Sequence, residues 1–218
     1  MPQQSPLLIA LILALVGFWS PWLQHPAAAL QLNAFELSEW VTFLPGVRLG
    51  ELPFGRLSFL APSACLAVLF GLAAAHTTRQ SGRALLPDTW LSWGLLALSV
   101  LCTFVVFPYY PYLVLVPRDF FNPEYQEFQL QFVVACAALV GVFIAFVLPE
   151  WLSALAQMAL ALIGAGFSAW ALWSVRPVAS ELLNAPWGVG YGWALILLGF
   201  AGALARGWGQ MFGPPPPR

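Results

Sequence analysis

The sequence predicts an all-α protein: a polytopic transmembrane bundle of about six membrane-spanning helices in a single domain covering residues 1–218. The first observation is composition, because hydrophobic residues make up 61% of the chain and charged residues 8%, against about 45–50% and about 25% in soluble domains. The second is segregation. The eight arginines and nine carboxylates all fall outside six apolar stretches, each about long enough to cross a hydrocarbon core of about 30 Å as a helix. The stretches are 7–23, 57–75, 89–107, 128–148, 151–173 and 189–205.

The first stretch has two interpretations. Its apolar run, followed by Pro21, Pro26 and three alanines ending at Ala29, is also typical of a signal peptide with a cleavage site. Residues 1–6 carry no Lys or Arg, which a signal peptide normally has. We therefore expect the segment to be retained as a membrane anchor. Under either interpretation the loop that follows lies on the outer, extracytoplasmic side of the membrane.

A short interfacial helix is predicted after the first crossing, at about 34–43. Asn33 and Glu36 have the spacing of a capping box. The apolar residues that follow, among them Leu37, Trp40 and Val41, recur at helical spacing, so the helix can lie on the outer membrane surface. Pro45 and the glycine after it are expected to end it.

Further boundary signals define the later crossings. Asp88 is predicted to cap the third, and Asn122 with Pro123 to begin the fourth. Pro149 should end the fourth and Glu150 begin the fifth, which predicts a tight antiparallel hairpin of these two helices. The proline-rich tail 213–218 is expected to be disordered.

Orientation follows from the loops. Counting arginines alone places four on each side, so we use the densest basic loop, which holds Arg79 and Arg83 and is flanked by two net acidic loops. This loop and both termini are expected in the cytoplasm. The predicted location is the plasma membrane of a bacterium, with the lipid bilayer as the first partner.

Composition also excludes several functions. With a net charge of −1 and no lysine, the chain offers no basic surface for nucleic acid. Cys65, Cys102 and Cys136 lie in apolar stretches without a CxxC pair, as small buried residues do. His25 and His76 are expected in loops, so neither a haem ligand nor another cofactor is predicted. No ionisable residue lies at helix depth, which disfavours intramembrane catalysis and proton relays. No catalytic, cofactor or metal residue is therefore predicted.

Ridges of small residues are the strongest internal pattern. They comprise Ser63, Ala67, Gly71 and Ala75 in the second crossing and Ala137, Gly141 and Ala145 in the fourth. Such ridges let helices approach closely in lipid. We favour packing within the bundle over docking to another subunit. Gln157, deep in the fifth crossing, is expected to bond a hydroxyl such as Ser99 or Thr103.

An aromatic and acidic loop is the candidate outer interaction surface. Together with Trp40, it comprises Tyr109, Tyr110, Tyr112, Arg118, Asp119 and Tyr125. Rings beside carboxylates can hold a cationic or sugar-like ligand. The favoured alternative is an interfacial aromatic belt, because Trp90, Trp151, Trp173 and Trp187 also lie near segment ends.

Ala10 and Ala14 give an AxxxA spacing in the first stretch. In this spacing, in size and in helix number, the chain resembles the six-helix substrate-binding subunits of energy-coupling vitamin transporters. The resemblance covers layout only, so no substrate-site residue carries over.

Three functions remain. The first is a non-catalytic subunit or accessory protein of a membrane complex. The alternative is a transporter or binding subunit for an uncharged or amphipathic small molecule, with a cavity near Gln157. An interfacial enzyme would require a pocket formed by at least two charged groups from the outer loops. Those groups are Glu36, Glu39, Arg118, Asp119 and Glu124.

Overall fold

A computed structural model describes residues 5–26, 30–80, 87–108, 126–182 and 184–212. The prediction of the all-α class is confirmed, with eight α-helices and three two-residue strands in these residues. The elements are α1 (Ser5–Trp19), β1 (Leu23–Gln24), β2 (Gln31–Leu32), α2 (Ala34–Trp40), the 3-10 helix η1 (Val41–Phe43), α3 (Pro45–Arg48), α4 (Arg56–Gln80), α5 (Trp90–Val106), α6 (Gln126–Ala145), α7 (Glu150–Leu182), β3 (Gly188–Val189) and α8 (Tyr191–Phe212). Four of them, α4, α6, α7 and α8, are long and apolar enough to cross a membrane, whereas α1 and α5 are apolar but shorter.

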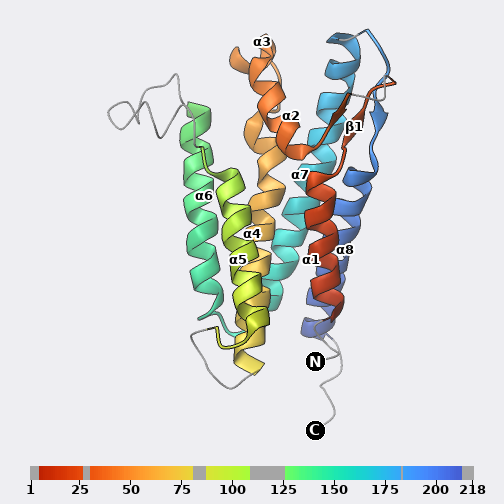
Figure 1. The fold of residues 1–218 in the computed structure, drawn as a ribbon. Coiled ribbons are helices and arrows are strands. Elements are labelled where there is room, and N and C mark those ends of the chain that lie inside the picture. Colours follow the sequence, from red (N-terminus) through yellow and green to blue (C-terminus); the bar gives the residue numbers. More distant parts are fainter. Residues whose placement is uncertain (1–4, 27–29, 81–86, 109–125, 183, 213–218) are drawn as a thin grey trace.

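The six longest helices run alternately up and down the bundle (Figure 1). We call the end where α1 begins and α8 finishes the terminal end, and the opposite end, which carries the three short strands, the sheet end. The strands form an antiparallel sheet in the order β2-β1-β3. The sheet joins the segment after α1 to the connection between α7 and α8.

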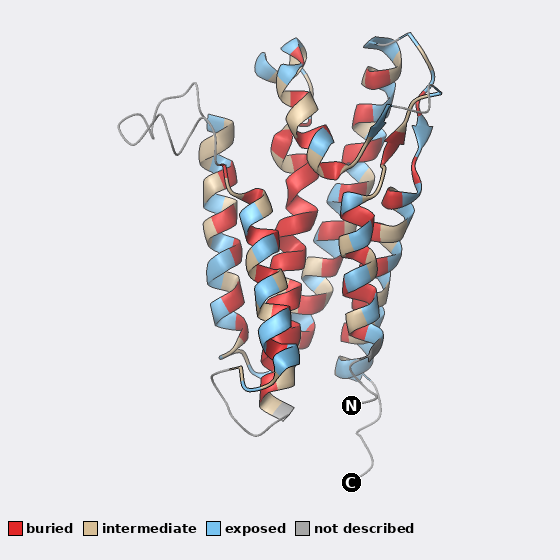
Figure 2. Cartoon of the chain, in the orientation of Figure 1, coloured by how far each residue is buried: buried red, intermediate tan, exposed pale blue. Residues whose placement is uncertain are grey.

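Helix α4 occupies the centre of the bundle. It packs against α1, α2, α5, α6 and α7, while α8 packs against α1 and α7. Figure 2 shows burial along nearly its whole length. Helix α4 carries buried apolar side chains on every side, as does a helix in a protein core or within a membrane. The bundle therefore has α5 and α6 on one side of α4 and α1, α7 and α8 on the other (Figure 1).

The predicted hairpin of the fourth and fifth crossings is wrong. The connection from α6 to α7 is short, as Pro149 indicated, but the two helices are not packed along their lengths. Each packs against α4 instead. A short connection fixes only the adjoining helix ends, and α4 fills the space between the two helices.

Several predicted helix ends differ from the structure. Helix α1 ends at Trp19, not at residue 23, because Pro21 interrupts it and the chain continues into β1. Helix α7 continues through Pro177 to Leu182 and so includes much of residues 174–188, which were predicted to connect the fifth and sixth crossings. Helices α4 and α8 extend beyond the predicted residues 75 and 205.

The capping signals gave mixed results. The Asn33 capping box is confirmed: the Asn33 side chain accepts from the Glu36 N–H at 2.9 Å, and the Glu36 carboxylate accepts from the Asn33 N–H at 2.8 Å. Pro45, however, opens α3 instead of ending a helix. Thr89, not Asp88, caps α5, because its hydroxyl accepts from the Ser92 N–H. The predicted cap at Asn122 and Pro123 and the tail 213–218 lie outside the described residues.

Candidate functional site

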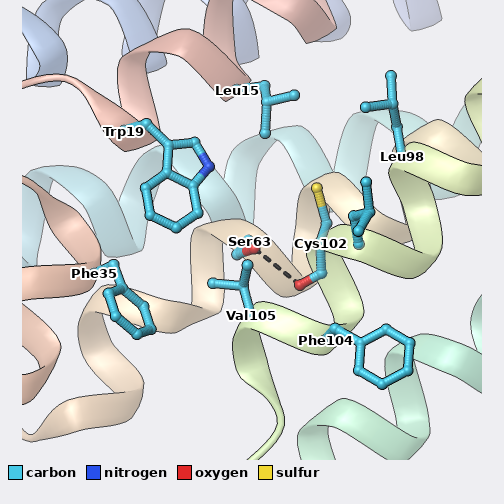
Figure 3. A pocket seen from close by; sticks show the side chains of 9 residues that line it. Leu15, Trp19, Phe35, Ser63, Leu98, Cys102, Phe104 and Val105 are labelled. Carbon is cyan, nitrogen blue, oxygen red and sulfur yellow. Dashed lines mark hydrogen bonds between the residues drawn. The ribbon is translucent and has the colours of Figure 1, made fainter.

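An apolar groove runs between α1 and α5, with α4 behind it and α2 toward the sheet end (Figure 3). Its volume is about 400 Å³. It is lined by Leu15, Trp19, Phe35, Ser63, Leu98, Leu101, Cys102, Phe104 and Val105. Segments separated by up to ninety residues in sequence therefore form one surface feature.

Two hydrogen bonds hold the floor of the groove to one of its walls. The Ser63 hydroxyl on α4 donates to the Cys102 carbonyl on α5 at 3.0 Å. In the reverse direction, the Ser99 hydroxyl on α5 donates to the Ala67 carbonyl on α4 at 2.6 Å. Both serines are buried. The Ser63 proton is already donated, so the hydroxyl has no free donor to offer a ligand.

Aromatic rings border the groove toward α2. Trp19, near the end of α1, and Phe35, in the first turn of α2, have ring centroids 5.8 Å apart. Figure 3 shows both rings at one end of the groove and Leu98 at the other. The capping box at Asn33 fixes the residue at which α2 begins and so the position of Phe35 in its first turn.

An ionic cluster joins three helices at the sheet end. The Arg56 guanidinium pairs with Glu39 of α2, and the Arg56 backbone N–H donates to the Glu127 carboxylate of α6. The Arg56 guanidinium also lies 5.4 Å from the ring centre of Phe128. A Cβ on Gly55 would lie 2.7 Å from the Glu127 oxygen, so a larger residue there would have to displace this carboxylate. The cluster fixes α2 and α6 to the start of α4.

A second polar group lies toward the terminal end. The Arg79 guanidinium donates to the Ala145 carbonyl at 2.7 Å and lies 3.5 Å from the Ser153 hydroxyl. It therefore ties the end of α6 and the start of α7 to α4. The expectation that His76 lies in a loop is wrong, because α4 continues to Gln80. His76 lies within electrostatic range of Arg79, Glu150 and Arg206.

The predicted packing ridge of α4 divides between two neighbours. Ser63 and the Ala67 carbonyl form hydrogen bonds with α5. Gly71 faces α6 instead, because a Cβ on it would lie 3.1 Å from the Val142 Cα. Ala75 is buried as well. One ridge thus packs two helices against α4.

On α6 the predicted ridge only partly coincides with the packed face. A Cβ on Gly141 would lie 3.1 Å from Val68 of α4, and Ala145 is buried, but Ala137 is exposed. Each four-residue step turns about 40° beyond a full helical turn. The ridge therefore rotates off the packed face, whose buried residues instead alternate steps of four and three. These are Gln131, Ala135, Ala138, Val142 and Ala145.

Gln157 bonds a different partner from the one expected. Its amide donates to the Ala203 carbonyl of α8 at 2.7 Å, and not to Ser99 or Thr103, because α7 packs against α8 and not against α5. Gln157 does not line the groove. Sequence reasoning also missed Gln131, which is fully buried and donates to the Val106 carbonyl of α5 at 2.6 Å.

The aromatic and charged residues expected at the outer surface lie in different environments. Trp40 is half-buried, and Trp187, expected in an aromatic belt, is buried at 1% exposure, where its carbonyl accepts from Arg176. Glu36 caps its own helix and Glu39 pairs with Arg56, so they form no joint pocket. The other residues of the candidate interaction surface and of the charged pocket expected for an enzyme lie outside the described residues. They are Tyr109, Tyr110, Tyr112, Arg118, Asp119, Glu124 and Tyr125.

Ala10 and Ala14, which supported the likeness to vitamin-transporter subunits, lie inside this chain's own bundle. A Cβ on Gly199 of α8 would lie 2.5 Å from Ala14, and one on Gly202 would lie 2.8 Å from the Ala10 side chain. The face of α1 that carries Ala10 and Ala14 is therefore covered by α8.

No family model matches the chain, and neither the curated proteins nor the solved structures contain a match. Within the described residues, no three His, Cys, Asp or Glu side chains group as a metal site.

Proposed function

We propose that the protein is a multi-pass protein of the plasma membrane and a non-catalytic subunit or accessory protein of a membrane complex. Four helices have the length and apolar character of membrane spans. Their alternating direction with α1 and α5 supports six crossings, with the terminal end in the cytoplasm and the sheet end outside. In this arrangement α2 lies at the outer surface.

The two short helices are compatible with six crossings. At 1.5 Å per residue, α1 with 15 residues and α5 with 17 residues are about 23 and 26 Å long. They fall about 7 and 4 Å short of a hydrocarbon core of about 30 Å. A mismatch of this size costs only fractions of a kcal/mol per ångström, because the bilayer thins locally.

The observation that carries the non-catalytic role is the use of the polar side chains inside the bundle. Ser63, Ser99, Gln131 and Gln157 each donate to a backbone carbonyl of a neighbouring helix. Donors used in this way hold helices together and are not available to a polar substrate, which favours a structural role for these side chains over a catalytic one.

The surface proposed for a protein partner is the outward face of α6, a helix whose main packing neighbours among the described elements are α4 and α5. Along it, Val133, Ala137, Val140 and Ile144 are exposed at helical spacing. Ala137 at its centre is small enough to admit a partner helix closely. The partner expected is a transmembrane helix of another protein.

The test is affinity purification of the tagged full chain from native membranes in mild detergent, followed by mass spectrometry. We expect a stoichiometric membrane protein that is lost in Ala137→Trp and retained in Ala97→Trp, a matched change on the exposed face of α5. Recovery of a lone monomer under several detergent conditions would contradict the proposal.

A second function is favoured by the groove: binding of an uncharged or amphipathic small molecule. A volume of about 400 Å³ is within the usual range for ligand sites, about 300–1,000 Å³. The site differs from the one expected near Gln157.

A further inference from the structure

We propose that the groove between α1 and α5 binds the acyl tail of a bilayer phospholipid. This inference rests on the proposed placement in a membrane and deepens the second function. It identifies the ligand class of the groove, which the volume alone leaves open.

The lining selects a hydrocarbon. Eight of the nine side chains are aliphatic, aromatic or a thiol, and the ninth, Ser63, already donates its proton to the Cys102 carbonyl. The Trp19 indole N–H, at the end toward α2, is the remaining polar group of the lining. A ligand that is polar along its length would therefore leave most of its hydrogen-bonding groups unsatisfied, which is costly in an apolar site. An alkyl chain has no such groups.

The length of the groove fits part of an acyl chain. From Leu98 to Val105 the groove extends seven residues along α5, about 10 Å at 1.5 Å per residue. A flexible alkyl chain can follow an irregular apolar surface of this length between two helices and make dispersion contacts with both walls.

The surroundings of the groove match the position of a lipid in the outer leaflet. The helix faces beside it expose Ile12 and Val16 on α1 and Leu101 and Phe104 on α5, which in a bilayer contact hydrocarbon. Trp19 and Phe35 border the end toward α2, and tryptophan is enriched at the headgroup level. A phospholipid with its headgroup beside α2 would therefore extend its tail between α1 and α5.

Binding in the groove differs from contact with the outer face of a helix. A tail in the groove touches α1, α4 and α5 together, so it makes more dispersion contacts than a tail beside a single convex helix. This lipid is expected to exchange more slowly than its neighbours and to remain through mild purification.

The test uses the full chain reconstituted into nanodiscs that contain a phospholipid with a photoreactive diazirine in its acyl tail. We expect labelling of Leu98, Cys102 and Val105 in several-fold excess over the exposed residues of α6. Leu98→Trp, which fills the groove, should lower this labelling several-fold, and so should Leu15→Trp from the opposite wall. Ala97→Trp, one residue away on the exposed face of α5, should leave it unchanged.

The outcomes separate this inference from the membrane placement. Labelling of all outward faces without excess in the groove would overturn the lipid site and leave the membrane placement intact. Absence of labelling on every helix would overturn both. Lipid extraction of the purified protein provides a second measurement: recovery of a stoichiometric phospholipid supports the site, whereas an equimolar isoprenoid or other apolar compound overturns it.

Discussion

The joint between α1 and α8 and the joints of α4 with its neighbours are built differently. At the first, glycines bring two backbones into contact: a Cβ on Gly199 would lie 2.5 Å from the Ala14 nitrogen and 2.6 Å from the Ala10 carbonyl oxygen. At the second, side chains reach across. Ser63 and Ser99 do so between α4 and α5, Arg56 does so toward Glu39 of α2, and Glu127 of α6 accepts from the Arg56 backbone N–H.

The difference indicates how each joint should respond to change. Close backbone packing depends on the absence of atoms, so any added group must displace a helix. A hydrogen bond between helices in lipid contributes modestly, about 0.6 kcal/mol on average. The α1–α8 joint should therefore be the sensitive one, although no polar side-chain bond crosses it in the residues that the structure describes.

The largest effect is expected from removing α1. Its buried face, Leu11, Ala14 and Phe18, packs inside the bundle, so a chain beginning at Leu30 would leave the glycine face of α8 uncovered. We expect this truncated chain not to accumulate as a folded protein in membranes. In the protein expressed from the full sequence, residues 1–29 should be retained, which intact mass spectrometry can check. A stable mature protein that begins at Leu30 would show that the segment is a cleaved signal and that the α1–α8 joint is dispensable.

The next largest effect is expected for Gly199→Ala. The added methyl would collide with backbone atoms of α1, which cannot rotate away, and we expect a loss of about 3 kcal/mol in unfolding free energy. The measurement is chemical or thermal unfolding in detergent. Gly166→Ala is the matched control, because no atom lies within 4 Å of that Cβ position on α7, and it should be neutral or slightly stabilising. Equal effects at both sites would refute the sensitivity of the α1–α8 joint.

A smaller loss is expected for Arg56→Gln. The guanidinium is buried, with 10% of its side chain exposed, but Glu39 remains 42% exposed and partly solvated. We therefore expect about 2 kcal/mol, below the figure for fully buried pairs. Arg48→Gln, a nearby arginine in an exposed bond to the Thr42 carbonyl, is the control. Unfolding of the two variants against the wild type checks the difference, and an Arg56 variant no weaker than the Arg48 variant would contradict the structural role of the cluster.

The helices were largely predictable from the sequence, because each apolar stretch carries its own signal. All six stretches correspond to one helix each, and the Asn33 capping box is present. The ends were less predictable where proline occurs: Pro21 stops α1, whereas Pro177 lies within α7. The residue type is the same, and only the packing around each proline separates the two outcomes.

The groove and the ionic cluster could not be predicted, because both depend on the order of helices around α4. Glu39, Arg56 and Glu127 are far apart in the chain and carry no shared motif. Likewise, the expected partner of Gln157 was wrong because a local pattern identifies a buried face but not the helix that covers it. The small-residue ridges could be predicted without knowing the order of the helices, because they depend on the spacing within one helix. The exposed Ala137 shows, however, that a fixed four-residue spacing follows the packed face only for about two turns.

The smallest effect is expected for the paired serines. Ser63→Ala and Ser99→Ala each remove one donor to a carbonyl across the α4–α5 joint, and each should cost about 0.6 kcal/mol. Because the carbonyls of Cys102 and Ala67 lie within helices and have helical partners, no buried acceptor is left wholly unsatisfied. The two bonds connect the same pair of helices, so a double-mutant cycle in unfolding should show a coupling energy different from zero. A serine variant as damaging as Gly199→Ala would reverse the comparison and make hydrogen bonding, not close packing, the dominant joint of this bundle.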